Sequence, residues 1–129
     1  MKTITREWLH RAKDDLDVIV EIIELSHLTN IVAFHAQQSI EKTFKALLEE
    51  NSEDVPKTHS LVRLYALAKE KIDFEIDELL LAEINDVYID TRYPGELGLV
   101  PYGKPSLEDS KKFFETAQII YDEIKQALS

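Results

Sequence analysis

The chain has 129 residues, of which 44% are hydrophobic and 31% charged, so one compact soluble domain is expected. The absence of cysteine excludes disulfides and thiolate ligands or nucleophiles, and the net charge of −10 works against nonspecific nucleic-acid binding. The start of the chain is not that of a signal peptide, and no window holds the roughly 20 apolar residues of a membrane span. We therefore expect a cytoplasmic protein without membrane contact.

Two long amphipathic helices are predicted in the N-terminal half of the chain. The first spans about residues 5–26, and its apolar residues follow the three-then-four spacing of one buried face: Trp8, Leu9, Ala12, Leu16, Ile19, Val20 and Ile23. The second spans about residues 30–50, with Thr29 or Asn30 as its N-cap. Its buried face is predicted to comprise Ala33, Ile40, Phe44, Leu47 and Leu48.

Three further helices are predicted in the C-terminal half. One spans about residues 58–71, and its apolar positions are Leu61, Leu64, Tyr65 and Ala68. The next spans about residues 75–91, and its apolar positions are Ile76, Leu79, Leu80, Ile84 and Val87. The last begins at Ser106, which resembles a capping box with Asp109, and its apolar positions are Phe113, Phe114, Ala117, Ile120, Tyr121, Ile124 and Leu128. No segment has the pattern of a strand. The sequence thus predicts an all-α fold, an up-and-down antiparallel bundle of four to five helices in a single domain over residues 1–129.

Residues 92–105 interrupt the helical pattern with a 14-residue connection. All three glycines of the chain and three of its four prolines fall between residues 85 and 106. A connection of this length is often a functional loop, but a chain that crosses from one end of a bundle to the other also needs a long segment. The sequence leaves both interpretations open.

The negative charge of the chain is concentrated in residues 72–90. This segment contains seven Asp and Glu residues and no Lys or Arg. Such a surface is either solvated or a docking surface for a basic protein, since complementary long-range fields guide association.

A polar stripe follows one face of the second predicted helix. It consists of His35, Gln38, Lys42 and Lys45, which are spaced by three, four and three residues. One interpretation is an exposed flank on which Glu41 and Lys45 form a favourable ion pair four residues apart. The other is a strip that binds an anion such as a nucleotide or a phosphate backbone.

His59, Arg92 and Tyr93 are the candidates for catalysis, and each has a structural alternative. His59 precedes the third predicted helix, where it either satisfies a helix terminus or titrates near neutral pH as a catalytic or phosphate-binding group. Arg92 can bind the free carbonyls of its own helix or a phosphate, and Tyr93 beside it shares that ambiguity. Two Glu-x-x-His pairs occur, Glu7 with His10 and Glu24 with His27, but both fall within the first predicted helix, whereas a di-iron bundle takes its two pairs from two different helices. We predict no metal site and no cofactor.

Four motifs in order along almost the whole chain resemble the HEPN domain family. They are WLHRAKDDL at residues 8–16, FHAQQSIEKTFKALL at residues 34–48, the Thr58-His59 pair and TRYP at residues 91–94. The resemblance implies a helical bundle that is commonly dimeric. Small prokaryotic members of the family are frequently encoded beside a minimal nucleotidyltransferase, in toxin–antitoxin-like pairs.

The ribonuclease motif of the family is absent from this chain. Many HEPN proteins are metal-independent ribonucleases that depend on an arginine followed, after four to six residues, by a histidine. None of the four arginines here, Arg6, Arg11, Arg63 and Arg92, has a histidine at that spacing. A non-catalytic role is therefore favoured over RNA cleavage.

Three functional hypotheses follow from the resemblance and the residues. The first is a homodimeric binding module that partners a minimal nucleotidyltransferase, with Asp86, Asp90, Arg92 and Tyr93 as the predicted contact residues. The second is a ribonuclease with a noncanonical site formed by Arg92, Tyr93 and His59, or across a dimer interface. The third is a domain that binds a nucleotide or RNA through His35, Gln38, Lys42 and Lys45.

Overall fold

The computed structural model describes residues 1–92 and 104–129, and for residues 90–92 it describes the backbone alone. Its elements are α1 (Thr3–Ile22), the short 3₁₀ helix η1 (Ser26–Leu28), α2 (Thr29–Glu50), α3 (Leu61–Ala68), α4 (Glu78–Arg92) and α5 (Leu107–Leu128). No strand occurs in either described range, so the predicted all-α class is confirmed.

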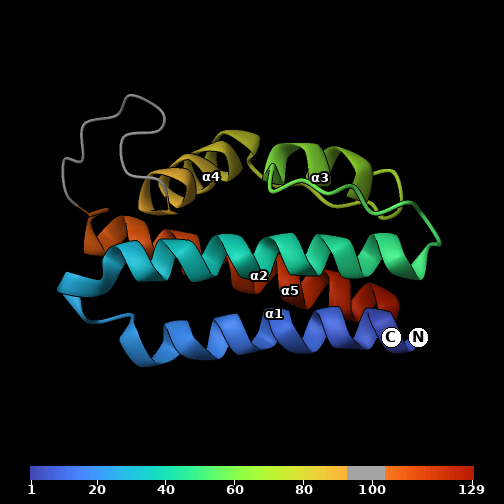
Figure 1. The fold of residues 1–129 in the computed structure, drawn as a ribbon, viewed down its shortest axis with the longest axis horizontal. Helices are drawn as coiled ribbons and strands as arrows, with labels where there is room; N and C mark the ends of the chain where they lie inside the picture. The colour runs from blue at the N-terminus through green and yellow to red at the C-terminus, as the bar shows by residue number, and fades with distance from the viewer. Residues whose placement is uncertain (93–103) are drawn as a thin grey trace.

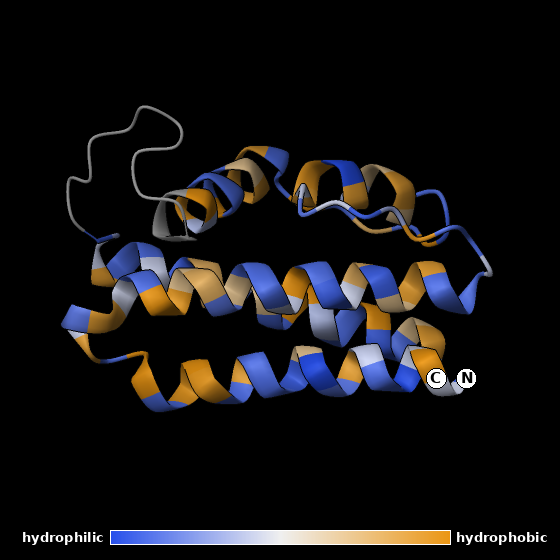
Figure 2. Ribbon diagram, in the orientation of Figure 1, coloured by the Kyte–Doolittle hydropathy of each residue, from blue (hydrophilic) through white to orange (hydrophobic). Residues whose placement is uncertain are grey.

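Helix α2 is the centre of the bundle and contacts α1, α3, α4 and α5. In Figure 1, α1 lies on one side of α2 and α3 with α4 on the other, while α5 packs beside α1 and α2. Because neighbours cover α2 on two sides, 14 of its 22 residues are buried. The other helices carry alternating apolar and polar bands, as amphipathic helices do (Figure 2).

The four long helices α1, α2, α4 and α5 alternate in direction, as in an up-and-down bundle (Figure 1). Helix α3 differs, because the connection before it first runs back along α2. His59 thus contacts Glu41 in the middle of α2, whereas Lys71, after α3, reaches Glu53 beyond the end of α2. Helix α3 therefore runs parallel to α2.

Two helices begin later than predicted because polar side chains cap them later in the chain. Helix α3 begins at Leu61 rather than near residue 58, since the Ser60 hydroxyl accepts a hydrogen bond from the Arg63 N–H at 3.3 Å. Helix α4 begins at Glu78 rather than near residue 75. There the Asp77 carboxylate accepts from the N–H groups of Leu79 and Leu80, at 3.0 and 3.4 Å.

The predicted cap of α2 is wrong, whereas that of α5 is confirmed. Helix α2 already includes Thr29, and Leu28 occupies the N-cap position without a side-chain hydrogen bond, because η1 leads directly into the helix. At α5 the Ser106 hydroxyl accepts from the Asp109 N–H at 3.0 Å. A polar side chain next to a helix caps it only where the backbone of that residue has the extended conformation of an N-cap.

The predicted buried faces hold for α2, α3 and most of α5, but two apolar residues elsewhere are exposed. Val20 of α1 is 56% exposed, and Leu79 of α4 is 83% exposed. The buried residues of α4 are Ile84, as predicted, and Leu81 and Tyr88, which were not among the predicted positions. Ile76 precedes α4 and lies in the connection from α3.

Most of the predicted loop over residues 92–105 lies outside the described residues. Helix α4 ends and α5 begins at the same end of the bundle, however (Figure 1). The connection between them is therefore not required to cross the bundle from end to end.

The C-terminus of α2 contains a serine in a conformation that favours glycine. Ser52 has φ 57°, and the N–H groups of Ser52 and Glu53 donate to the carbonyls of Glu49 and Leu48, both at 3.0 Å, in a Schellman motif. Ser52→Gly is expected to raise the free energy of unfolding by about 0.5–1 kcal/mol, because glycine adopts this conformation without a Cβ clash. Chemical denaturation measures the gain. Ser52→Ala keeps the Cβ and is the control, so an equal gain there would contradict the conformational argument.

Candidate functional site

An aspartate of α1 joins two residues of the predicted polar stripe. The Asp15 carboxylate lies 2.8 Å from His35 Nδ1 through one oxygen and accepts from Lys42 Nζ at 2.8 Å through the other. Asp15 is buried, whereas His35 and Lys42 remain partly exposed. The carboxylate therefore ties α1 to α2. The sequence indicated that Asp15 faces the core, since it shares a face of the helix with the apolar residues Ala12 and Ile19 at helical spacing.

A second carboxylate, that of Glu41, organises the opposite flank of the stripe. Lys45 Nζ donates to Glu41 Oε2 at 2.9 Å, which confirms the predicted four-apart ion pair, but both side chains are buried, so the predicted exposed flank is wrong at these two residues. Gln37 Nε2 donates to Glu41 Oε1 at 3.0 Å, one turn earlier on the helix. His59 Nδ1 lies 2.8 Å from the same oxygen and comes from the connection before α3. We call Gln37, Glu41, Lys45 and His59 the Glu41 cluster.

The hydrogen bonds of the Glu41 cluster keep its carboxylate ionised. Burial alone acts to raise the pKa of Glu41, but the hydrogen bonds from Lys45, His59 and Gln37 outweigh it and lower the pKa below its ordinary value. An ionised carboxylate only accepts hydrogen bonds, so His59 Nδ1 must be the donor. The neutral His59 imidazole then carries its lone pair on Nε2.

His59 is held in place but remains open to solvent. Its side chain is 61% exposed. Gln37 Nε2 also donates to the His59 carbonyl at 3.1 Å, which anchors the backbone, and Gln38 Nε2 in turn donates to Gln37 Oε1 at 2.8 Å. A solvent-exposed histidine whose Nδ1–H is bound to a carboxylate has the arrangement of a general base.

The end of α4 lies next to His59. The ring of Tyr88 is 6.0 Å from that of His59 and stacks on Phe34 at 5.5 Å. Arg92 follows Tyr88 by one helical turn and ends α4. The fold therefore brings His59 close to the turn of α4 that leads to Arg92. The Arg92 side chain and the whole of Tyr93 lie outside the described residues.

The predicted anion-binding stripe is divided between the two carboxylates. Lys42 and His35 contact Asp15, whereas Lys45 pairs with Glu41 and lies 5.7 Å from the centre of the Trp8 ring. Gln38 donates to Gln37. Because both ammonium groups already have carboxylate partners, a phosphate bound here would compete with Asp15 and Glu41 for them.

The segment before and within α4 forms an acidic surface, which we define by Asp73, Glu75, Asp77, Glu78, Glu83 and Asp86. All six side chains are exposed. No Lys, Arg or His within residues 1–89 and 104–129 forms an ion pair with any of them. Asp86, one of the predicted contact residues, belongs to this surface, while the side chain of Asp90 is not described.

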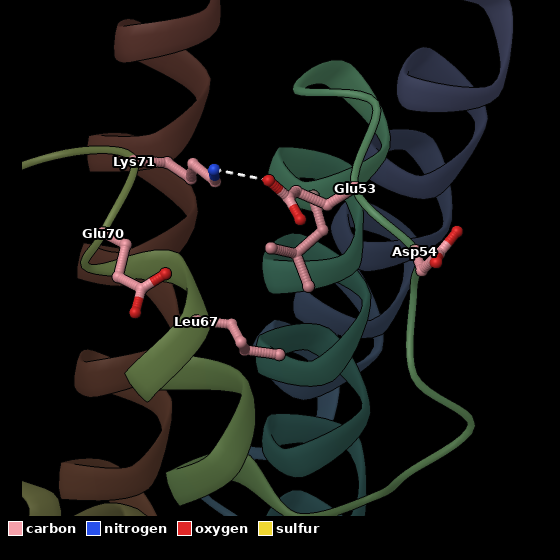
Figure 3. Close-up of a pocket in the computed structure, with 6 residues that line it drawn as sticks. Glu53, Asp54, Leu67, Glu70 and Lys71 are labelled. Atoms are coloured by element: carbon pink, nitrogen blue, oxygen red, sulfur yellow. Dashed lines mark hydrogen bonds and ion pairs between the residues drawn. The ribbon is translucent and has the colours of Figure 1, made fainter.

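A small hollow at the end of α2 is too narrow for a ligand. It encloses about 30 Å³ between Leu48, Leu67 and the connection after α2, and Lys71 reaches across it to Glu53 at 2.5 Å (Figure 3). A volume of this size holds little more than one water molecule, whereas small-molecule sites span about 300–1,000 Å³.

No described helix is long and apolar enough for a membrane crossing.

Comparison with known proteins agrees with this architecture. The chain resembles the crystal structure of TT1696 from Thermus thermophilus, with 25% sequence identity and a TM-score of 0.81 over 97% of this chain and 98% of that one. It also resembles the crystal structure of ST0689, an archaeal HEPN homologue, with 20% identity and a TM-score of 0.73 over the full length of both chains. No curated protein matches the chain. The profile of the HEPN domain family matches residues 5–127, and the chain therefore belongs to the HEPN domain family.

Proposed function

We propose that this HEPN protein is a homodimeric binding module whose partner is a minimal nucleotidyltransferase, in a toxin–antitoxin-like pair. The acidic surface is the observation that carries the proposal. Its six exposed carboxylates have no ion-pair partner among the described side chains, so their charge is available to another molecule.

The chemistry of this surface favours a protein partner over nucleic acid. Phosphate backbones are bound by Lys and Arg, and residues 72–90 contain neither. A negative surface instead accelerates encounter with a positively charged protein and excludes acidic ones. The neighbouring gene product is the first partner to test, because small HEPN proteins are frequently encoded beside a nucleotidyltransferase.

Charge reversal on α4 is expected to weaken the complex with the neighbouring nucleotidyltransferase by about tenfold or more. The variant Glu83→Lys/Asp86→Lys changes two exposed residues one turn apart. The loss of affinity is expected to come mainly from a lower association rate. Surface plasmon resonance at two salt concentrations measures both the rate and its ionic-strength dependence.

The matched control is Asp14→Lys/Glu21→Lys on α1. Both variants replace two carboxylates with two ammonium groups and raise the net charge from −10 to −6. The control is expected to bind as the wild type does. Equal losses in both variants would show a net-charge effect and remove the assigned surface, and no complex with the wild-type protein would remove the proposal.

The Glu41 cluster favours a second candidate function, metal-independent RNA cleavage at a noncanonical site. In that reaction His59 Nε2 removes the proton of a ribose 2′-hydroxyl, whose oxygen attacks the adjacent phosphorus. The P–O5′ bond breaks, which leaves a 2′,3′-cyclic phosphate, and the departing 5′-oxygen takes a proton from water. Arg92, one turn beyond Tyr88, is the residue proposed to neutralise the phosphate.

If the protein cleaves RNA in this way, His59→Ala is expected to lower the rate by about 10²–10⁴-fold, the usual contribution of a general base. His10→Ala, at an exposed histidine of α1, is the matched control and is expected to leave the rate unchanged. The measurement is cleavage of a labelled single-stranded RNA in the presence of EDTA. Intact RNA after incubation with repeated wild-type preparations would exclude this function.

A further inference from the structure

An apolar hollow lies between the start of α4 and the middle of α5. It is an open depression with a volume of about 190 Å³ and is lined by Glu75, Ile76, Asp77, Leu80, Thr116 and Ile119. Two large apolar side chains that are exposed among the described residues belong to its two helices. Ile119 lines the hollow and is 46% exposed, and Leu79, next to Leu80, is 83% exposed. An apolar surface of this kind is covered when a partner binds.

The charges around the hollow are mostly of one sign. Glu75 and Asp77 line it directly, and both belong to the acidic surface, which contributes no cation. On α5, Lys112 and Glu123 flank Thr116 and Ile119 by one helical turn each, so their charges offset each other. An occupant therefore meets an apolar floor beside uncompensated carboxylates.

The size of the hollow excludes a typical small-molecule ligand. Its volume is below the roughly 300–1,000 Å³ of small-molecule sites. It suits one aliphatic side chain presented by a larger molecule. Interfaces commonly use such an anchor, in which one buried apolar side chain is surrounded by polar contacts that exclude water.

We infer that this hollow is the anchor site for a basic amphipathic helix of a protein partner. The helix inserts one aliphatic side chain between Leu80 and Ile119, and its Lys and Arg residues pair with Glu75 and Asp77. This inference rests on the proposed binding function and specifies where the partner docks and by what chemistry. It adds a recognition element, the apolar anchor, that charge attraction alone does not supply.

The direct probe is a fluorescein-labelled synthetic helix of Lys and Leu residues at amphipathic spacing, titrated against the full chain by fluorescence anisotropy. Saturable binding that weakens with salt is expected. The variant Leu79→Ser/Ile119→Ser is expected to weaken it by about tenfold or more, because it removes the apolar contact of Ile119 at the hollow and the exposed apolar surface of Leu79, which precedes the lining residue Leu80. Val20→Ser, at an exposed apolar residue of α1, is the matched control and is expected to bind like the wild type.

Two altered peptides separate the two parts of the recognition. A peptide with Ser in place of every Leu keeps the charge and tests the anchor, and one with Glu in place of every Lys tests the charge. Both are expected to lose binding. Equal affinity of the wild type and Leu79→Ser/Ile119→Ser for the Lys and Leu peptide would overturn the inference, as would full binding of either altered peptide.

The same variants distinguish this inference from the proposed function. If the neighbouring nucleotidyltransferase binds the wild type and Leu79→Ser/Ile119→Ser equally well, the docking site is wrong and the binding function stands. If the nucleotidyltransferase binds neither protein, the proposed partner is wrong, and the peptide titration still decides whether the hollow accepts a basic amphipathic helix. Unchanged thermal unfolding of the variant verifies that only the surface has been altered.

Discussion

Glu41→Gln is expected to lower the free energy of unfolding by about 3–5 kcal/mol, because it leaves a buried ammonium group without its counter-charge. The side chain of Lys45 is only 10% exposed and that of Glu41 only 7%. Gln37 and His59 would also lose the carboxylate oxygen that accepts their hydrogen bonds. Urea denaturation followed by circular dichroism measures the loss.

A surface ion pair on α1 with the same spacing is the matched control. Glu7 and Arg11 are 53% and 62% exposed, and Arg11 Nε lies 3.1 Å from Glu7 Oε1. Glu7→Gln is expected to cost less than about 1 kcal/mol, since water and salt screen such a pair. Similar costs for Glu7→Gln and Glu41→Gln would show that burial does not strengthen the Glu41 cluster.

The double variant Glu41→Gln/Lys45→Met tests the mechanism of that loss. It removes both charges, so no uncompensated ion is left in the interior, and much of the stability lost in Glu41→Gln is expected to return. A double variant no more stable than Glu41→Gln would mean that the loss comes from the hydrogen bonds of Gln37 and His59 instead.

The lowered pKa of Glu41 also predicts that the free energy of unfolding depends on pH. Its pKa is lower in the folded protein than its ordinary value of 4.5, so its contribution is present above that pH and is lost as the pH falls through the folded pKa. Glu50 acts in the same direction, because hydrogen bonds from the Lys2 N–H and the Thr5 hydroxyl lower its pKa. Below pH 4.5, Glu41→Gln is therefore expected to lose less stability than the wild type.

Phe44→Ala is the second substitution with a large expected effect, a loss of about 3–5 kcal/mol in the free energy of unfolding. Phe44 is completely buried, and its ring lies 6.2 Å from that of Tyr65 and 6.3 Å from that of Phe74. It thereby joins α2 to α3 and to the connection that leads into α4. Chemical denaturation measures the loss.

Hydrogen exchange shows where Phe44→Ala loosens the fold. The amides of α3 and of residues 69–77 are expected to exchange faster than those of α1, because the ring contacts of Phe44 are with Tyr65 of α3 and with Phe74. Phe114→Ala, at a partly buried residue of α5, is the control and is expected to cost less than half as much. Equal costs, or uniform exchange along the chain, would contradict the assigned role.

The helices and most of their buried faces were predictable from the sequence. The faces of α2 and α3 follow a clear apolar spacing, and their predicted residues are all buried. Val20 lies at the edge of the apolar stripe of α1, whereas Leu79 lies on the opposite face of α4 from the buried residues Leu81, Ile84 and Tyr88. Helical periodicity identifies the stripe, whereas the neighbouring helices determine how wide a part of it is covered.

The candidate site was predictable only where its contacts are local. Glu41 and Lys45 are four residues apart on one helix, so their ion pair follows from helical geometry alone. The contact of Glu41 with His59 spans 18 residues and that of Asp15 with Lys42 spans 27. Neither spacing restricts the distance between the two side chains until the helices have packed.

The sequence by itself thus determined the all-α class, the positions of the helices, the HEPN resemblance and the concentration of negative charge before and within α4. Each depends on residue type, motif or periodicity along the chain. Only the tertiary structure decided that Lys42 is bound to Asp15, that His59 is oriented by Glu41, that Leu79 stays exposed and that Ile119 lines an acidic hollow. These features depend on which faces of different helices meet, because packing determines both the partners of a polar side chain and the apolar surface that is left uncovered.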